Sequence, residues 1–100
     1  MSEKTYSDND LMDDAHAAEF LTEVFQKGTP SDFAEAIGRV CRARNCMGEV
    51  ATKTGLARPA LYRALSPTGN PRLTTLSAVL KALNLEVVLK PSLSEHHERR

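Results

Sequence analysis

The chain has 100 residues, of which 41% are hydrophobic, and it balances 13 Lys and Arg against 13 Asp and Glu. That length predicts one small domain with a single core. No apolar run reaches membrane-spanning length, and the N-terminus MSEKTYSDND lacks the order of a signal peptide, so we expect a cytoplasmic protein with no membrane partner.

Charge is distributed unevenly along the chain. Residues 1–35 hold nine acids and two lysines, a net charge of −7, whereas residues 36–72 hold seven basic residues and one acid, Glu49, a net charge of +6. An acidic third followed by a basic third indicates two different surfaces, of which the second suits a polyanion. Ordinary solvated helix faces would give the same distribution, so charge alone leaves both interpretations open.

Apolar periodicity predicts a mostly helical chain. Residues 1–12 are expected to be disordered, and a first helix is expected over about residues 14–27. Ser31 is a good N-cap for a second helix over about residues 32–45. Each of these helices has one apolar face.

Two shorter helices and a longer one follow. The third predicted helix covers about residues 48–54 and is stopped by Gly55. The fourth covers about residues 58–65, and Pro59 is tolerated there because it falls in the first turn. A fifth helix is predicted over about residues 73–83. The segment LEVVLK, residues 85–90, then has the composition of a short strand.

The fourth helix has two distinct sides at 100° per residue. Its apolar side carries Ala57, Ala60, Leu61, Ala64 and Leu65. Its other side carries Arg58, Pro59, Tyr62, Arg63 and Ser66. Two short helices separated by a glycine turn, the second with an apolar back and a basic, aromatic front, have the sequence form of a helix-turn-helix.

The span from Ile37 to Leu89 resembles the repressor-like helix-turn-helix proteins of bacteria and phages, the Xre or lambda type. More narrowly, it is similar to the addiction-module antidote proteins, the HigA-like antitoxins. The resemblance lies in IGRVCRARN, ATKTGLARPALYRALSPTGNP and TTLSAVLKALNLEV. Two positions depart from the family pattern: Glu49 stands where a glutamine is common, and Ala57 stands at the usual Ser cap of the recognition helix.

The resemblance implies an all-α fold, a repressor-like helix-turn-helix bundle of about five helices with a short C-terminal β-strand. It divides the chain into an acidic arm and helix (residues 1–30), a DNA-binding domain (31–91) and a disordered tail (92–100). It implies an antitoxin of a type II toxin-antitoxin system that binds operator DNA as a homodimer, autoregulates its operon and neutralises a toxin.

Toxins of such families are usually small, basic, RNA-cleaving proteins of the RelE/ParE type, which the acidic N-terminal third would suit. Two alternatives stay open. One is a stand-alone transcriptional repressor, which differs only in the role of residues 1–35. The other is a protein-interaction module that has lost DNA binding, for which Glu49 is the best argument, because a carboxylate repels phosphate.

The candidate DNA-binding residues are Arg58, Pro59, Tyr62, Arg63, Ser66, Lys53, Arg39 and Arg42. Arg58 lies at the N-terminal end of the recognition helix, where a guanidinium can bond the O6 and N7 atoms of a guanine. Tyr62 contacts either DNA or the neighbouring helix. The arginines at positions 39, 42 and 44 are either peripheral phosphate contacts or plain surface. Ser66 serves either the turn after the helix or a phosphate.

Nothing in the residue pattern predicts an enzyme, a cofactor or a metal site. There is no G-x-S-x-G or GxxxxGK motif, and His16 is the one histidine outside the C-terminal tail. Cys41 and Cys46 have no second pair to complete a zinc site, and Cys41 falls on an apolar helix face. We therefore interpret Cys41 as a reduced core residue.

Overall fold

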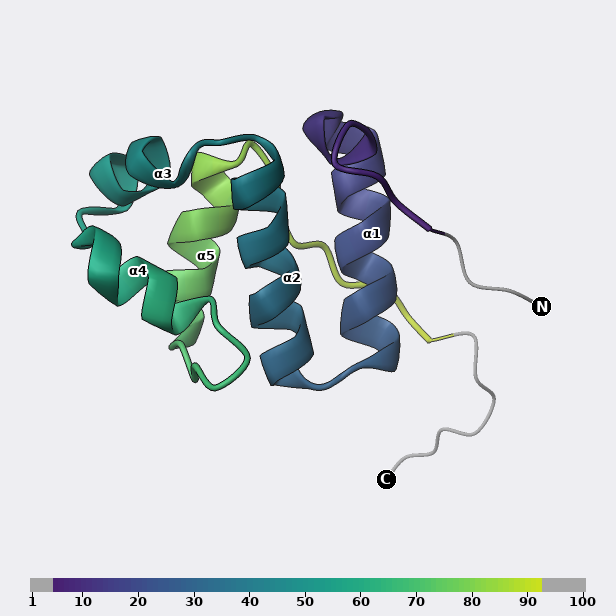
Figure 1. The fold of residues 1–100 in the computed structure, drawn as a ribbon. Coiled ribbons are helices and arrows are strands. Elements are labelled where there is room, and N and C mark those ends of the chain that lie inside the picture. Colours follow the sequence, from purple (N-terminus) through teal and green to yellow (C-terminus); the bar gives the residue numbers. More distant parts are fainter. Residues whose placement is uncertain (1–4, 93–100) are drawn as a thin grey trace, which may run out of the picture.

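The structure, a computed structural model, describes residues 5–92. Its helical elements are the 3₁₀ turn η1 (Asp10–Met12) and the α-helices α1 (Asp14–Lys27), α2 (Pro30–Ala43), α3 (Met47–Thr54), α4 (Arg58–Ala64) and α5 (Leu73–Ala82). The predicted all-helical class with five α-helices is therefore confirmed. Helix α1 packs along α2, and α3 contacts α2, α4 and α5 (Figure 1).

The segment before α1 is ordered from residue 5, so the predicted disorder of residues 1–12 is wrong for that part; residues 1–4 lie outside the described chain. Ser7 and Asp10 exchange hydrogen bonds, Ser7 N–H to Asp10 Oδ2 at 3.0 Å and Asp10 N–H to Ser7 Oγ at 3.1 Å. This turn buries Tyr6 and Leu11. These two apolar side chains pack the otherwise polar segment against the helices.

Helix α2 begins two residues earlier than predicted. Thr29, and not Ser31, is its N-cap: Thr29 Oγ1 accepts from Asp32 N–H at 3.1 Å, and Asp32 Oδ2 accepts from Thr29 N–H at 2.9 Å. This capping box satisfies two backbone donors at once, and Pro30 occupies the first helical position, where its missing N–H costs nothing. The capping box at Thr29, followed by Pro30, stabilises the helix start more than the single serine cap predicted at Ser31.

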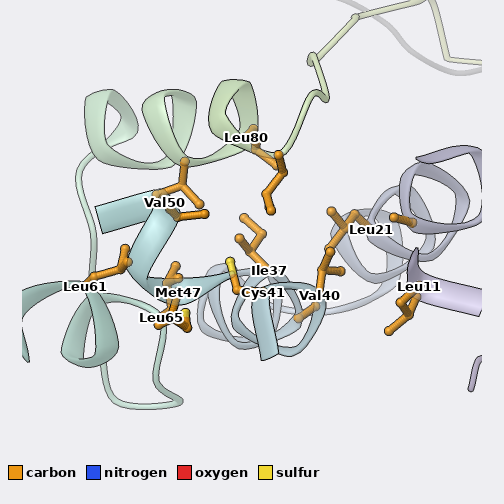
Figure 2. Close-up of a cluster of buried hydrophobic side chains, with 14 of the residues drawn as sticks. Leu11, Leu21, Ile37, Val40, Cys41, Met47, Val50, Leu61, Leu65 and Leu80 are labelled. Atoms are coloured by element: carbon orange, nitrogen blue, oxygen red, sulfur yellow. The ribbon is translucent and has the colours of Figure 1, made fainter. Parts of the chain in front are cut away.

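One hydrophobic core runs through all five helices and the N-terminal segment (Figure 2). Its fully buried large side chains are Leu11, Ile37, Val40, Cys41, Val50, Leu61, Leu65 and Val79. Ala17 and Leu21 of α1 belong to the same cluster. The acidic N-terminal third is thus packed on the basic third through a shared apolar interior, with the charged groups outside.

The predicted strand over residues 85–90 is not formed. The described chain contains no strand, and after Asn84, which ends α5 with a left-handed φ of 68°, residues 85–90 have no regular structure. Val87, Val88 and Leu89 are 67%, 74% and 88% exposed. A strand needs a partner to satisfy its backbone groups, and residues 5–84 offer none, because they form helices and turns.

Candidate nucleic-acid interface

The connection between α3 and α4 is a tight turn centred on Gly55. This residue has φ 78°, and its N–H donates to Ala51 O at 2.9 Å. Only glycine adopts this left-handed conformation without steric cost, which is the role predicted for it. Ala51, 6% exposed, is buried one helical turn before the glycine and allows the two helices to approach. Helix α4 then begins at Arg58.

Helix α4 is divided into a buried and an exposed side as its sequence predicts. Leu61 and the following Leu65 are 0% and 2% exposed, whereas Tyr62 is 47% exposed. Arg58, Pro59, Tyr62 and Arg63 are all exposed, so four of the candidate residues share the surface of one helix. Ala57 is the N-cap and makes no side-chain cap hydrogen bond, so the first backbone N–H groups of α4 are left without a side-chain acceptor.

The start of α3 lies next to this surface. A Cβ atom placed on Gly48 would lie 3.5 Å from the Arg58 Cζ atom, so the Arg58 guanidinium extends back over the first turn of α3. On the outer face of α3, Lys53 Nζ lies 3.2 Å from Glu49 Oε2, and both side chains are more than half exposed. The positive charge of Lys53 therefore offsets the negative charge of Glu49, the residue that stands in place of the glutamine common in the family.

Ser66 takes part in the turn that follows α4. Its Oγ donates to Arg63 O at 2.8 Å and lies 3.4 Å from Thr68 Oγ1. Gly69 N–H donates to Ser66 O at 3.0 Å, and a Cβ on Gly69 would overlap the carbonyl oxygens of Arg63 and Ala64. These contacts close the loop tightly against the helix end. The hydroxyl of Ser66 is therefore engaged in the turn.

Arg39 of α2 is bound to α1 and to the segment before α1. Its guanidinium donates to the Tyr6 carbonyl, lies 3.8 Å from Asp8 Oδ1, and stacks 5.3 Å above the centroid of the Phe20 ring. Arg42 is exposed on the same helix, and both arginines line a groove between α1 and α2. Arg42 also reaches toward the end of α4, because a Cβ atom placed on Gly38 would lie 3.3 Å from Arg42 Nη1 and 2.8 Å from the Leu65 carbonyl oxygen.

Arg44 has a structural role that sequence reasoning missed. Its Nε donates to Leu11 O at 2.9 Å and its Nη1 donates to Leu83 O at 3.1 Å, while Nη2 lies 2.9 Å from Asp14 Oδ1. The side chain is 14% exposed. These partners lie 30 or more residues away in the sequence, so no local pattern could indicate them.

Neither a metal site nor a membrane-spanning helix is found in the part of the chain that the structure covers. No group of three or more His, Cys, Asp or Glu side chains in residues 5–92 is placed to hold a metal ion. None of the helices there is long and apolar enough to cross a membrane.

The geometry defines a small all-helical domain that presents an exposed basic and aromatic helix next to a tight glycine turn. Residues 3–91 match the model of the family described as probable addiction module antidote protein, and the chain belongs to this family. An uncharacterized protein of Haemophilus influenzae (strain Rd) is 41% identical over 73 residues, which cover 73% of this chain and 74% of the relative. No solved structure matches the chain significantly. The predicted resemblance is confirmed at the level of addiction-module antidotes.

Proposed function

We propose that this protein is the antitoxin of a type II toxin-antitoxin system, that it binds operator DNA through α3 and α4 as a helix-turn-helix, and that it represses its own operon. Family membership supports the antitoxin role. The observation that carries the DNA-binding part is the division of α4, which buries Leu61 while exposing Arg58, Tyr62 and Arg63. A basic, aromatic helix face after a tight turn has the form of a recognition helix for the major groove.

The proposal assigns base contacts to Arg58, Tyr62 and Arg63, and a flanking phosphate contact to Lys53. Pro59 would pack beside the DNA backbone, and Ser66, whose hydroxyl donates to Arg63 O, would shape the loop that follows the recognition helix. The protein acts by binding in the cytoplasm and catalyses no reaction. Its toxin partner is a small basic protein of the RelE/ParE type, attracted by the acidic surface of the N-terminal third. One recognition helix reads too few bases for operator affinity, so the active form is a homodimer on a palindromic site, with two copies of α4 about 34 Å apart.

The test measures operator binding and toxin neutralisation separately. The double variant Arg58→Ala, Arg63→Ala is titrated against the DNA upstream of its own gene, and the adjacent reading frame is co-expressed to measure growth. We expect the variant to lose operator binding and to keep its fold, since both side chains are exposed. Unchanged operator binding by the folded variant would favour the interaction-module alternative. Full operator binding without any protection from the neighbouring gene product would favour a stand-alone repressor.

A further inference from the structure

Helix α2 ends in a backbone motif that joins its two cysteines. Beyond Ala43 the chain leaves the helix through Asn45, which has a left-handed φ of 54°. Cys46 N–H donates to Cys41 O at 3.0 Å, and Asn45 N–H donates to Arg42 O at 3.0 Å. Over the six residues from Cys41 to Cys46, the sixth N–H donates to the first carbonyl and the fifth N–H donates to the second carbonyl. This pair of hydrogen bonds is a Schellman motif. The motif brings the side chains of its first and last residues together, and here both are cysteines.

The same motif ends α5 with different side chains. Leu85 N–H donates to Leu80 O at 2.9 Å, and Asn84 N–H donates to Lys81 O at 2.9 Å, with Asn84 again left-handed. Leu80 and Leu85 both belong to the hydrophobic cluster. The chain thus closes one helix end with two leucines and the other with two thiols. Packing alone does not require sulfur at this place, so the cysteine pair adds chemistry that the leucine pair lacks.

The two thiols differ in their access to solvent. Cys41 is 0% exposed in the core (Figure 2), whereas Cys46 is only partly buried, at the position directly before α3. Burial, together with the nearby Cys46 thiol, raises the pKa of the Cys41 thiol to about 12. Burial also raises the pKa of Cys46. Both groups are protonated thiols at neutral pH, and Cys46 is the one that a small solute can reach.

We propose that Cys41 and Cys46 form a reversible dithiol–disulfide site that closes under sustained exposure to hydrogen peroxide. The disulfide links the C-terminal end of α2 to the start of α3. Cys46 is the residue oxidised first, and Cys41 is the residue that resolves it. This inference does not depend on DNA binding or on the toxin.

The reaction proceeds in two steps. The Cys46 thiolate attacks one oxygen of peroxide, the O–O bond breaks, and Cys46 sulfenic acid forms while the released hydroxide takes up a proton to become water. The Cys41 sulfur then attacks the Cys46 sulfur and loses its proton, and a second water leaves as the S–S bond forms. Two thiols lose two electrons in total and one peroxide becomes two waters. A dithiol reductant such as dithiothreitol restores both thiols by exchange.

The disulfide would act on the joint between α2 and α3. The Cys46 carbonyl accepts from Val50 N–H at 2.9 Å, so Cys46 belongs to the first turn of α3 as well as to the end of α2. Closing the bond fixes that joint, and the Cys46 N–H should exchange with solvent more slowly in the oxidised protein. Because the thiolate is the reacting form, oxidation should be slow at neutral pH. As the pH is raised toward the pKa of Cys46, the oxidation rate should increase about tenfold per pH unit.

The experiment exposes the folded full-length protein to excess hydrogen peroxide and follows intact mass, free thiols in denaturant, and disulfide-mapped peptides. We expect both thiols to disappear together, with a mass loss of two hydrogens, no covalent dimer, and full recovery with dithiothreitol. Sulfinic acid at Cys46 with Cys41 still free would overturn the proposal. A disulfide between two chains, or two unmodified thiols after prolonged treatment at alkaline pH, would do so as well.

Matched single-cysteine variants identify the order of events. Cys46→Ala keeps the buried thiol, and we expect it to resist peroxide while the protein is folded. Cys41→Ala keeps the accessible thiol, which should stop at a sulfenic acid that dimedone traps. If Cys41→Ala does not fold, Cys41→Val fills the same site and takes its place. Rapid oxidation of Cys41 in the Cys46→Ala variant would contradict the proposed order.

Discussion

Arg44 Nη2 lies 2.9 Å from Asp14 Oδ1, and this ion pair joins the end of α2 to the first turn of α1. The same guanidinium donates to the carbonyl groups of Leu11 and Leu83. Asn84, at the end of α5, donates its side-chain N–H to the other Asp14 oxygen at 2.9 Å. One nearly buried side chain therefore connects the N-terminal segment, α1, α2 and α5.

We expect Arg44→Met to lower the free energy of unfolding by about 2–4 kcal/mol, because it leaves two carbonyl groups without their charged donor. The half-exposed carboxylate adds little beyond these hydrogen bonds. Urea unfolding followed by circular dichroism measures the loss. Arg42→Met is the control, since Arg42 is exposed on the same helix and should change stability by less than about 0.5 kcal/mol. Equal unfolding midpoints for the two variants would refute this role for Arg44.

Arg58→Ala should weaken operator binding by about 1–3 kcal/mol and relax the preference at one base position, without lowering thermal stability. Leu61→Ala is the contrasting variant. It empties a fully buried position and should destabilise the fold by about 2–5 kcal/mol. Operator titrations paired with thermal melts separate a contact effect from a folding effect. A folded Arg58→Ala protein with unchanged affinity for every sequence would show that this guanidinium reads no base.

Arg39 gives a test of which face approaches DNA. If Arg39 contacted a phosphate, Arg39→Ala would weaken binding to all DNA sequences alike. It would also reduce the slope of log affinity against log salt concentration by about one unit. Because the guanidinium is bound to the N-terminal segment, we expect the slope to stay unchanged and the amide hydrogens of residues 5–9 to exchange faster. Arg42→Ala is the matched control, since it has the same charge on the same helix. A lower slope for Arg39→Ala, with no change for Arg42→Ala, would show that Arg39 does contact a phosphate.

The proposed role of the acidic N-terminal third in toxin binding is best tested by changing its charge. Deleting residues 1–30 would remove Leu11, Ala17 and Leu21 from the core, so a truncated protein would lose its fold together with any binding surface. We expect the triple variant Asp8→Asn, Glu19→Gln, Glu35→Gln to bind the toxin more weakly, most clearly at low salt, with unchanged operator affinity. Glu86→Gln, an exposed acid after α5, is the control. If the triple variant protects cells and binds the toxin like the control, the acidic surface is not the docking site.

In the proposed homodimer, the exposed apolar segment after α5 is the candidate for pairing across the two-fold axis. Proline lacks the N–H that a strand donates, so Val87→Pro or Val88→Pro should shift the protein from dimer to monomer. Both are tested because adjacent N–H groups of a strand point to opposite edges. Sedimentation velocity at micromolar concentration measures the change, with Val88→Thr as a strand-compatible control. Dimers of equal strength in both proline variants would place the dimer contact elsewhere.

Much of the helical framework could be predicted because its causes are local. Gly55 ends α3 through its own left-handed φ, and Pro59 places the start of α4 through its own ring. The alternation of Leu61 and Tyr62 between inside and outside follows from helical periodicity alone. The start of α2 was misplaced because two capping signals competed within three residues, and the reciprocal pair at Thr29 is stronger than one serine.

The exposed residues of α4 could be read from the sequence, since periodicity and turn chemistry act within a few residues. The contacts of the other arginines depend on how distant segments pack. Arg39 and Arg44 look alike in a helix pattern, yet each is bound to groups about 33 residues away in the N-terminal segment. The same long-range packing orders residues 5–12 and buries Tyr6 against Phe20, whose ring centroid lies 5.3 Å away. Contacts between distant segments form because burying apolar surface draws the segments together, and no local pattern records which charged groups then meet.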